Sequence, residues 1–273
     1  MRFSRTPLLV KALILITLVL PLAVPLNFVL IQPGEGSPLF PKVLQVKQSP
    51  LPTYKVNGQL YLLSIYVTNP DAKVLGYQVL QCWAIAECVV MPRSVMYQED
   101  TDTKAEIKKG KEEMKKSQSA ALTAAQNLFA SRYPTIKLNE VSDSSLQVSL
   151  KNTGGPSGGL IFALGITDLF TPEDLAQGRK IAASGTVSAT GKIGPIGGIA
   201  EKIIAAKKAG ATLLFASQEN CDELPTHVSG ITVVAVSRLS DAVTYLQKPV
   251  EVQGAKAHSS SSRPVIGCTN LGA

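Results

Sequence analysis

The sequence predicts a mixed fold of α-helices and β-strands that follows an apolar N-terminal helix. Three features indicate this: an apolar run near the N-terminus, a Lys/Glu-rich helical segment in mid-chain, and alternating strand-like and helical segments over residues 154–247. The chain has 273 residues, of which 45% are hydrophobic and 17% charged. This composition excludes a disordered polyelectrolyte and suits one or two domains with their own cores.

The first predicted element is the apolar run Ala12–Ile31. Its length of about 20 residues matches the hydrocarbon core of a bilayer. Arg2, Arg5 and Lys11 precede it, so the positive-inside rule places the N-terminus in the cytoplasm and the body outside. A cleaved signal peptide is the alternative, but no clean cleavage site follows the run. We therefore expect residues 1–33 to form a basic n-region and a transmembrane signal anchor of a single-pass cell-membrane protein.

Residues 34–133 predict a small extracytoplasmic α/β region that ends in a long helix. We expect a linker at Gln32–Pro41, followed by a strand of a hairpin at Gln59–Thr68, after the Asn57-Gly58 turn. A short helix at Ala72–Trp83, a second strand at Val89–Met91 and the long helix at Thr103–Tyr133 should follow.

The long helix has a charged first half and an alanine-rich second half. Its charged run, Lys104–Lys116, is most simply a solvated helix face. A buried face is predicted from the spacing of Met114, Leu122, Ala125 and Phe129. The net charge of +7 is not concentrated on one segment of the body, so we expect no nucleic-acid partner.

The densest part of the sequence lies between residues 134 and 248. Ser145–Leu150 alternates in polarity and predicts a strand, and a glycine-rich turn then leads into the apolar segment Leu160–Ile166, which predicts a buried helix. Residues 249–273 contain a run of four serines and little periodicity, which predicts a loose C-terminal tail.

Ser157 is the candidate nucleophile. It lies in the segment Asn152-Thr-Gly-Gly-Pro-Ser-Gly-Gly-Leu160, near the first turn of the predicted buried helix. A serine there has its hydroxyl among unpaired backbone N–H groups, at the positive end of the helix dipole. The loop backbone around Gly155 and Gly158 could then stabilise a tetrahedral oxyanion. The alternative is an ordinary N-cap serine in a tight turn.

Lys202 is the candidate base for this serine. The segment from Pro195 to Gly210 predicts a turn, a helix from about Ile199 and a glycine stop. At 100° per residue, Lys202 falls on the apolar, small-residue side of this helix, while Glu201 and Lys208 point the opposite way. Desolvation would lower the pKa of its ammonium group, as a lysine base requires. The alternative is a lysine that snorkels at the edge of an amphipathic helix.

Histidine is a less suitable base in this chain. His227 lies in a predicted loop and His258 in the serine-rich tail, so a Ser-His-Asp triad is unpromising, although His227 stays open as a second candidate. Two histidines and no CxxC pair give no metal site, and we expect neither a metal nor another cofactor.

The two segments together resemble the proteolytic domain of Lon-type proteases. Gly-Pro-Ser-Gly-Gly, Ser184-Gly185-Thr186 and Pro195-Ile-Gly-Gly carry the resemblance, which covers about Val148–Leu246. It implies the α+β Lon proteolytic-domain fold over residues 134–248, with a dyad of Ser157 and Lys202 and with Ser184 orienting the lysine. Gly158 stands where most family members have alanine.

The rest of the chain looks like the membrane-anchored, ATPase-free branch of this family. A PDZ domain usually precedes the protease in that branch, but only 23 residues, Pro134–Pro156, separate the long helix from Ser157. We therefore expect no PDZ-type recognition of substrates. The nearest P-loop lookalike, Gly185–Ile193, has the wrong spacing and has isoleucine where Mg²⁺ needs Ser or Thr, so no ATP site is expected.

The four cysteines could form disulfides in an exported body. Cys82 and Cys88 can pair only if the chain turns between them, and Cys221 could pair with Cys268 in the tail; four free thiols are the alternative. The sequence thus predicts an anchored, extracytoplasmic, ATP-independent serine endopeptidase that acts on proteins or peptides. A catalytically silent scaffold on the same fold is the rival, and a homo-oligomer stays open.

Overall fold

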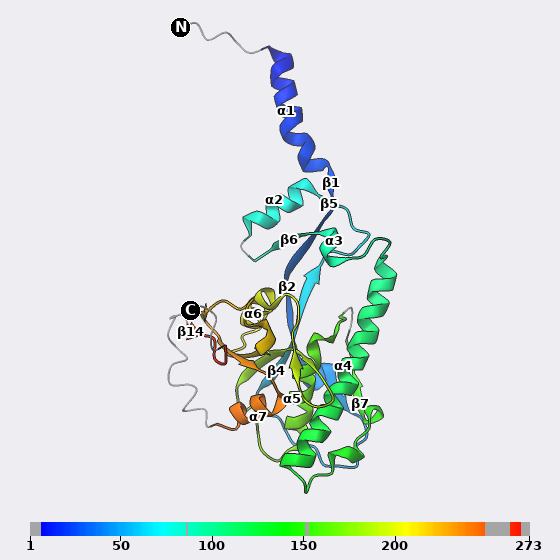
Figure 1. Cartoon of the computed structure of the whole chain (residues 1–273), viewed down its shortest axis with the longest axis vertical. Coiled ribbons are helices and arrows are strands. Elements are labelled where there is room, and N and C mark those ends of the chain that lie inside the picture. Colours follow the sequence, from blue (N-terminus) through cyan, green and yellow to red (C-terminus); the bar gives the residue numbers. More distant parts are fainter. Residues whose placement is uncertain (1–6, 86, 151–152, 249–262, 269–273) are drawn as a thin grey trace. The chain divides into compact units, whose positions relative to one another are not determined.

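A computed structural model describes residues 7–85, 87–150, 153–248 and 263–268 of the chain (Figure 1). The chain forms two compact units, one made of residues 1–32 and 66–106 and the other of residues 33–65 and 107–273. Strands β2 (Phe28–Pro38) and β4 (Gln59–Val67) and helix α4 (Thr103–Arg132) each contribute residues to both units. The candidate catalytic residues Ser157, Ser184 and Lys202 all lie in the second unit.

The first unit combines short helices with paired strands. Strand β1 pairs antiparallel with β5, and the first residues of β2 pair antiparallel with β6. A disulfide between Cys82 and Cys88, with a Cα–Cα distance of 5.1 Å, ties the last turn of α2 to the segment that enters β6. The elements not yet given are α1 (Leu8–Ala23), β1 (Pro25–Leu26), β5 (Val74–Leu75), α2 (Gly76–Ala84), β6 (Val89–Pro92) and α3 (Arg93–Met96).

The second unit is built on parallel strands in the order β13-β11-β8-β4, with β2 next to β4. Parallel neighbours need crossover connections, and helix α6 provides the one between β8 and β11. The elements of this sheet and its helices are β8 (Lys180–Ser184), β11 (Leu213–Ser217), β13 (Thr232–Val236), α5 (Gly159–Phe170), α6 (Ile199–Lys208) and α7 (Leu239–Leu246).

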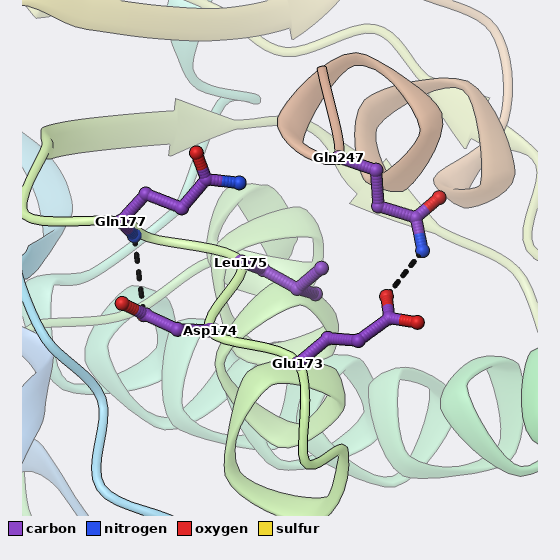
Figure 2. Close-up of a pocket in the computed structure, with 5 residues that line it drawn as sticks. All are labelled: Glu173, Asp174, Leu175, Gln177 and Gln247. Atoms are coloured by element: carbon purple, nitrogen blue, oxygen red, sulfur yellow. Dashed lines mark hydrogen bonds between the residues drawn. The ribbon is translucent and has the colours of Figure 1, made fainter. Parts of the chain in front are cut away.

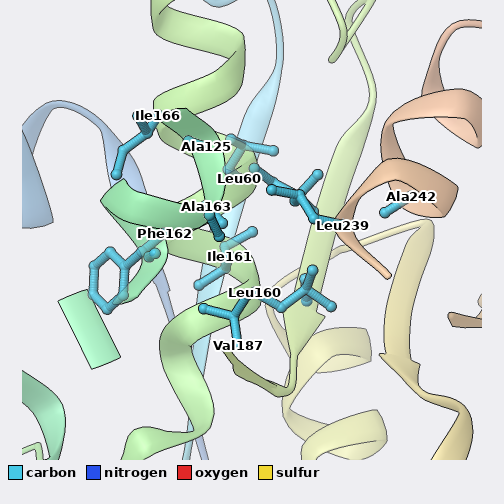
Figure 3. Packing of buried hydrophobic residues seen from close by; sticks show 14 of the residues in the cluster. Leu60, Ala125, Leu160, Ile161, Phe162, Ala163, Ile166, Val187, Leu239 and Ala242 are labelled. Carbon is cyan, nitrogen blue, oxygen red and sulfur yellow. The ribbon is translucent and has the colours of Figure 1, made fainter. Parts of the chain in front are cut away.

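Alternate residues of the parallel strands enter two separate cores. Leu60 and Leu62 of β4 pack with α4, α5 and α7 on one face of the sheet, whereas Tyr61 and Leu63 pack with α6 on the other. Figure 3 shows the first core, where consecutive residues of α5 meet α7 and Val187. Helix α5 is buried almost throughout, as its apolar sequence predicts.

The described part of the second unit also contains three antiparallel two-stranded sheets. They join β3 (Leu44–Val46) to β7 (Leu146–Val148), β9 (Thr186–Val187) to β10 (Ile193–Gly194), and β12 (His227–Val228) to β14 (Arg263–Pro264). The mixture of helices and strands confirms the predicted fold class in its coarse form. The predicted short helix, second strand and long helix of residues 34–133 correspond to α2, β6 and α4.

The prediction of one helix over Ala12–Ile31 is wrong. Helix α1 ends at Ala23, because Val24 precedes Pro25 and adopts an extended conformation, and the chain then enters β1 and β2. Within the part of the chain that the structure describes, every helix falls short of the combined length and apolarity that a membrane crossing requires.

The prediction of a linker over Gln32–Pro41 is also wrong, because residues up to Pro38 continue strand β2. Gly34 in this segment lets the backbone of β2 lie close to that of β4, because a Cβ added to Gly34 would lie only 2.6 Å from the carbonyl oxygen of Ser64. The hydroxyl of Ser64 in turn accepts the N–H of Glu35 at 3.0 Å.

Two further predictions need correction. No strand precedes the Asn57-Gly58 turn over residues 50–58, and β4 pairs in parallel with β8, so this turn does not close a hairpin. Residues 263–268 of the predicted loose tail form β14 and a bridge to β13. The remainder of that tail, 249–262 and 269–273, lies outside the described residues, as do Asn152 and His258.

Candidate active site

Ser157 lies in a single 3-10 turn, Pro156–Gly158, that leads directly into α5. Gly155 precedes this turn with φ of 89°, a left-handed conformation that other residues adopt at a cost. Pro156 then occupies the start of the turn, where its missing N–H leaves no donor unpaired. The sequence Gly-Pro-Ser therefore brings the serine to the positive end of the dipole of a buried helix.

Helix α4 holds the backbone on the N-terminal side of Ser157. The N–H of Gly155 donates to the carbonyl of Gly110 at 2.8 Å, and the hydroxyl of Ser117 donates to the carbonyl of Pro156 at 2.8 Å. A Cβ added to Gly154 would lie 2.9 Å from the Gly110 backbone, so the contact requires glycine. Because the Gly155 N–H already has an acceptor, it is not a free donor for an oxyanion, contrary to our expectation for this residue.

Strand β8 holds Ser157 from the other side. The carbonyl of Ser157 accepts the N–H of Gly185 at 2.9 Å and the hydroxyl of Ser184 at 3.3 Å, and the N–H of Leu160 donates to the Gly185 carbonyl at 3.0 Å. Ser184 is buried, and this bond fixes the turn of the candidate nucleophile. The structure thus brings Ser157 and Ser184 together through the serine backbone.

Lys202 lies in the first half of α6, which packs on β8 and β11. Its side chain is only 3% exposed, and burial lowers the pKa of its ammonium group from 10.5 to about 8. The negative charge of Glu201 opposes this shift. Glu201 is itself buried, whereas we expected it on the outer face with Lys208, which is exposed. At a pKa of about 8, a useful fraction of Lys202 is neutral near pH 7 and able to accept a proton.

The glycine at position 158 has a steric explanation. A Cβ there would lie 2.8 Å from Leu62 Cδ1 and 3.0 Å from the ring of Phe162, so these two side chains occupy the space that alanine would need. Phe162 also lines a pocket of about 190 Å³ between α4, α5 and β7, together with Leu146, Val148 and others. Glycine at position 158 therefore allows Leu62 and Phe162 to pack directly against the turn of the candidate nucleophile.

A larger, open pocket of about 440 Å³ lies at the other end of α5, and Figure 2 shows its lining residues. Glu173 accepts a hydrogen bond from Gln247 at 2.6 Å, and Asp174 accepts the N–H of Gln177 at 3.1 Å. The first of these bonds connects the loop after α5 to the residue that follows α7, and the second lies within the loop. Since α5 separates this pocket from Ser157, the pocket is not part of the dyad site.

The remaining predicted site features have clear positions. Cys221 and Cys268 form a disulfide with a Cα–Cα distance of 5.6 Å. The P-loop lookalike is the β9–β10 hairpin, so its glycines do not lead from a strand into a phosphate-binding helix. His227 is exposed on β12 and bonds to Thr226 at 3.3 Å. Within the described residues, no group of three or more His, Cys, Asp or Glu side chains could hold a metal ion.

Sequence reasoning missed Gly110 and Ser117. Both lie in or just after the Lys/Glu run, whose other members are mostly exposed as predicted. One signal was present: an isolated glycine inside a helical segment costs about 1 kcal/mol relative to alanine and often has a packing reason. Here the reason is the approach of the Gly154–Gly155 backbone.

Comparisons with known proteins identify domains that are similar in sequence to this one. The family model for the Lon protease (S16) C-terminal proteolytic domain matches residues 102–247, and this range includes α4. The mitochondrial Lon protease homolog of Drosophila melanogaster is 36% identical over 121 residues, which are 42% of this chain and 12% of that protein. Lon protease 2 of Herpetosiphon aurantiacus is 32% identical over 103 residues, 36% of this chain and 12% of that protein.

The Lon protease of Campylobacter concisus is 34% identical over 94 residues, or 33% of this chain. The chain spans only 11% of the length of that relative, so the similarity concerns the proteolytic domain and not the whole of these larger proteins. The family match itself covers more than half of the chain and includes Ser157, Ser184 and Lys202. The chain therefore belongs to the Lon protease (S16) family, through the C-terminal proteolytic domain of that family.

Proposed function

We propose that this protein is a membrane-anchored, extracytoplasmic serine endopeptidase that cleaves protein or peptide substrates without ATP. Two observations support the proposal: Ser157 lies at the start of a buried helix, and Lys202 is 3% exposed with a pKa lowered to about 8. An ordinary structural lysine would keep its ammonium in water. Membership of a protease family makes the same two residues the natural dyad.

In the proposed reaction, the neutral amine of Lys202 takes the hydroxyl proton of Ser157 while the serine oxygen attacks the scissile carbonyl. The dipole of α5 favours the negative charge that develops on the carbonyl oxygen. The Lys202 ammonium then donates its proton to the leaving amine, and the C–N bond breaks to give an acyl-enzyme. Water, deprotonated by Lys202, hydrolyses the ester and returns Ser157.

The location outside the cytoplasm is supported by the cysteines. All four are paired in two disulfides, and disulfides persist mainly in oxidising compartments. ATP is scarce in such compartments, and the P-loop lookalike is a hairpin. These two observations favour a nucleotide-independent enzyme.

Membrane attachment is supported by the apolar surface of the first unit. Large apolar side chains of α1, such as Leu9 and Leu13, are exposed on this helix. The start of helix α2 lies next to the C-terminal end of α1 in space, since the N–H of Gly76 donates to the Val24 carbonyl at 3.2 Å. Its sequence has no charged residue, and Trp83 is 67% exposed. Exposed apolar and aromatic groups of this kind suit a lipid interface.

The central test is labelling with a serine-reactive fluorophosphonate. The wild-type protein should react at Ser157 and cleave an unfolded protein substrate, and Ser157→Ala should do neither while keeping its circular dichroism spectrum. Addition of ATP and Mg²⁺ should not change the wild-type rate. A folded wild type that is neither labelled nor active would instead favour a silent scaffold.

The topology has a separate test. A reporter that works only in the cytoplasm, fused after Leu246, should stay silent in cells, and the full chain should resist alkaline extraction from membranes. Replacement of Leu13 by lysine should release the protein. Reporter activity in the cytoplasm would refute the proposed location without bearing on the dyad.

A further inference from the structure

Asn220 makes a pair of buried hydrogen bonds that the catalytic scheme does not use. Its side chain is 1% exposed; its Oδ1 accepts the N–H of Ile196 at 3.0 Å, and its Nδ2 donates to the carbonyl of Ile196 at 2.8 Å. The backbone N–H and the backbone carbonyl of Ile196 are therefore both hydrogen-bonded to one amide side chain, which comes from a distant part of the sequence. A third, longer contact, 3.5 Å from Nδ2 to Glu223 Oε2, agrees with this orientation of the amide.

The segment held in this way leads directly to Lys202. Gly198 follows Ile196 in the left-handed conformation, with φ of 68°, and is the N-cap of α6. The carbonyl of Gly198 accepts the N–H of Lys202 at 3.0 Å, which is the first hydrogen bond of that helix. A side chain that fixes Ile196 therefore fixes the start of α6, and the burial of Lys202 depends on where this first turn lies.

Asn220 is in turn held by the end of the chain. It ends the 3-10 turn Gln218–Asn220, and the next residue, Cys221, is bonded to Cys268. We call residues 263–268 the C-terminal strap. Gln218 donates from its side chain to the carbonyl of Gly267 at 3.1 Å, and the N–H of Ala235 in β13 donates to the carbonyl of Ile266 at 2.7 Å. The strap thus joins the Asn220 turn to the edge strand of the parallel sheet.

We propose that Asn220 is a positioning residue for Lys202, and that the disulfide-bonded C-terminal strap keeps Asn220 in place. This inference rests on the proposed function for its effect on catalysis. Its physical content is independent of that function: without the Asn220 bonds, the first turn of α6 loosens and water reaches the amine of Lys202. The consequence is a lysine with a pKa closer to its ordinary value and a slower proton transfer.

The test measures the pKa of Lys202 directly, in the full-length protein. Trace acetylation with acetic anhydride at a series of pH values, followed by mass spectrometry of the Lys202 peptide, reports the neutral fraction of this one amine whether or not the protein is active. The wild type should titrate near the value of about 8 given by the structure. In Asn220→Ala the midpoint should rise by about one unit, toward that of a solvated lysine.

Peptide cleavage supplies the second readout, with the active fraction counted by fluorophosphonate titration so that misfolded protein does not contribute. Asn220→Ala should lower kcat about tenfold or more with little change in KM, and the rising limb of the pH–rate profile should move upward with the lysine pKa. Glu219→Ala is the matched control, because Glu219 lies in the same turn and its carboxylate pairs at the surface with Lys192 at 2.8 Å. That variant should leave both readouts unchanged.

Two further variants keep the inference testable if Asn220→Ala does not fold. Asn220→Asp retains an acceptor for the Ile196 N–H and loses the donor. The pair Cys221→Ser and Cys268→Ser removes the strap disulfide, with Cys82→Ser and Cys88→Ser as the matched control. The Asp variant and the strap variant should both raise the Lys202 pKa by less than the alanine variant does, and the control pair should not.

An unchanged Lys202 pKa in the folded Asn220 variants overturns the inference, and so does an equal shift in Glu219→Ala. If the wild type shows the lowered lysine pKa but no cleavage, the proposed function fails, and the effect of Asn220 on the lysine is still decided by the labelling.

Discussion

Replacement of Lys202 by methionine should abolish activity and raise stability at the same time. Methionine keeps most of the length of the side chain but removes a charge that is 3% exposed. Burial lowers the pKa of this lysine from 10.5 to about 8, and each unit corresponds to about 1.4 kcal/mol, so the folded protein carries a penalty of about 3.5 kcal/mol for keeping the ammonium form. The variant is freed of this penalty, and it also lacks the base.

The sign of the pH dependence follows from the same shift. Between pH 8 and 10.5 the unfolded chain binds more protons at this lysine than the folded one does, so the penalty is fully present below pH 8 and fades as the pH rises. The free energy of unfolding of Lys202→Met should exceed that of the wild type by about 3.4 kcal/mol at pH 7, but by only about 1.4 kcal/mol at pH 9.5.

Urea unfolding followed by circular dichroism at the two pH values measures this difference. Lys207→Met is the control, because Lys207 is exposed on the same helix and its loss should change stability by a few tenths of a kcal/mol at most at both pH values. A variant that is no more stable than the wild type at pH 7, or whose gain does not shrink at pH 9.5, would refute a desolvated lysine. Full activity in Lys202→Met would refute the dyad, and His227 would be the next base to test.

Three other predictions follow from described contacts. Ser117→Ala leaves the Pro156 carbonyl without its donor, so the free energy of unfolding should fall by about 1 kcal/mol, and kcat should fall while KM changes less. A variant with wild-type stability and wild-type kcat would contradict the conclusion that α4 holds the turn of Ser157. Burial raises the pKa of Asp168 to about 6, and its Oδ2 has no partner within the described residues, so Asp168→Asn should be more stable than the wild type at pH 8 but not at pH 4 in urea melts; a pH-independent difference would count against this. Trp83 is the only tryptophan of the chain and is exposed on α2, so brominated lipid should quench the tryptophan fluorescence of the reconstituted protein if α2 lies at the lipid interface. Unquenched emission from a membrane-inserted protein would show that α2 does not lie there.

Local sequence was enough to predict the segments whose packing follows from periodicity. The buried helix after Ser157 and the amphipathic helix that carries Lys202 could both be placed within a few residues, because apolar spacing and glycine stops determine them. The family resemblance, carried by the same two segments, is confirmed by the family match. These elements depend on neighbours in the sequence or on one face of one helix.

The failures concern contacts between distant segments. Gln32–Pro41 has the composition of a linker, but residues up to Pro38 continue β2, which lies next to β4 in the sheet and brings Gly34 against Ser64. Likewise, the use of the Gly155 N–H depends on the carbonyl of Gly110, which no local pattern around Ser157 indicates. Helix angle alone places Glu201 on the outer face, but this side chain is buried in the structure.

The parallel pairing of β4 with β8 has a consequence for synthesis. Leu60 lies opposite Ile181, so β4 leaves the ribosome about 120 residues before the strand that covers its edge. At 5–20 residues per second, this edge waits roughly 6 to 24 s for its partner, with Leu60 and Leu62 still lacking the helix that will bury them. A recombinant fragment that starts at residue 102, where the family match begins, lacks this strand. Strand β8 would then become an open, apolar edge, and such a fragment should aggregate although it contains every candidate catalytic residue.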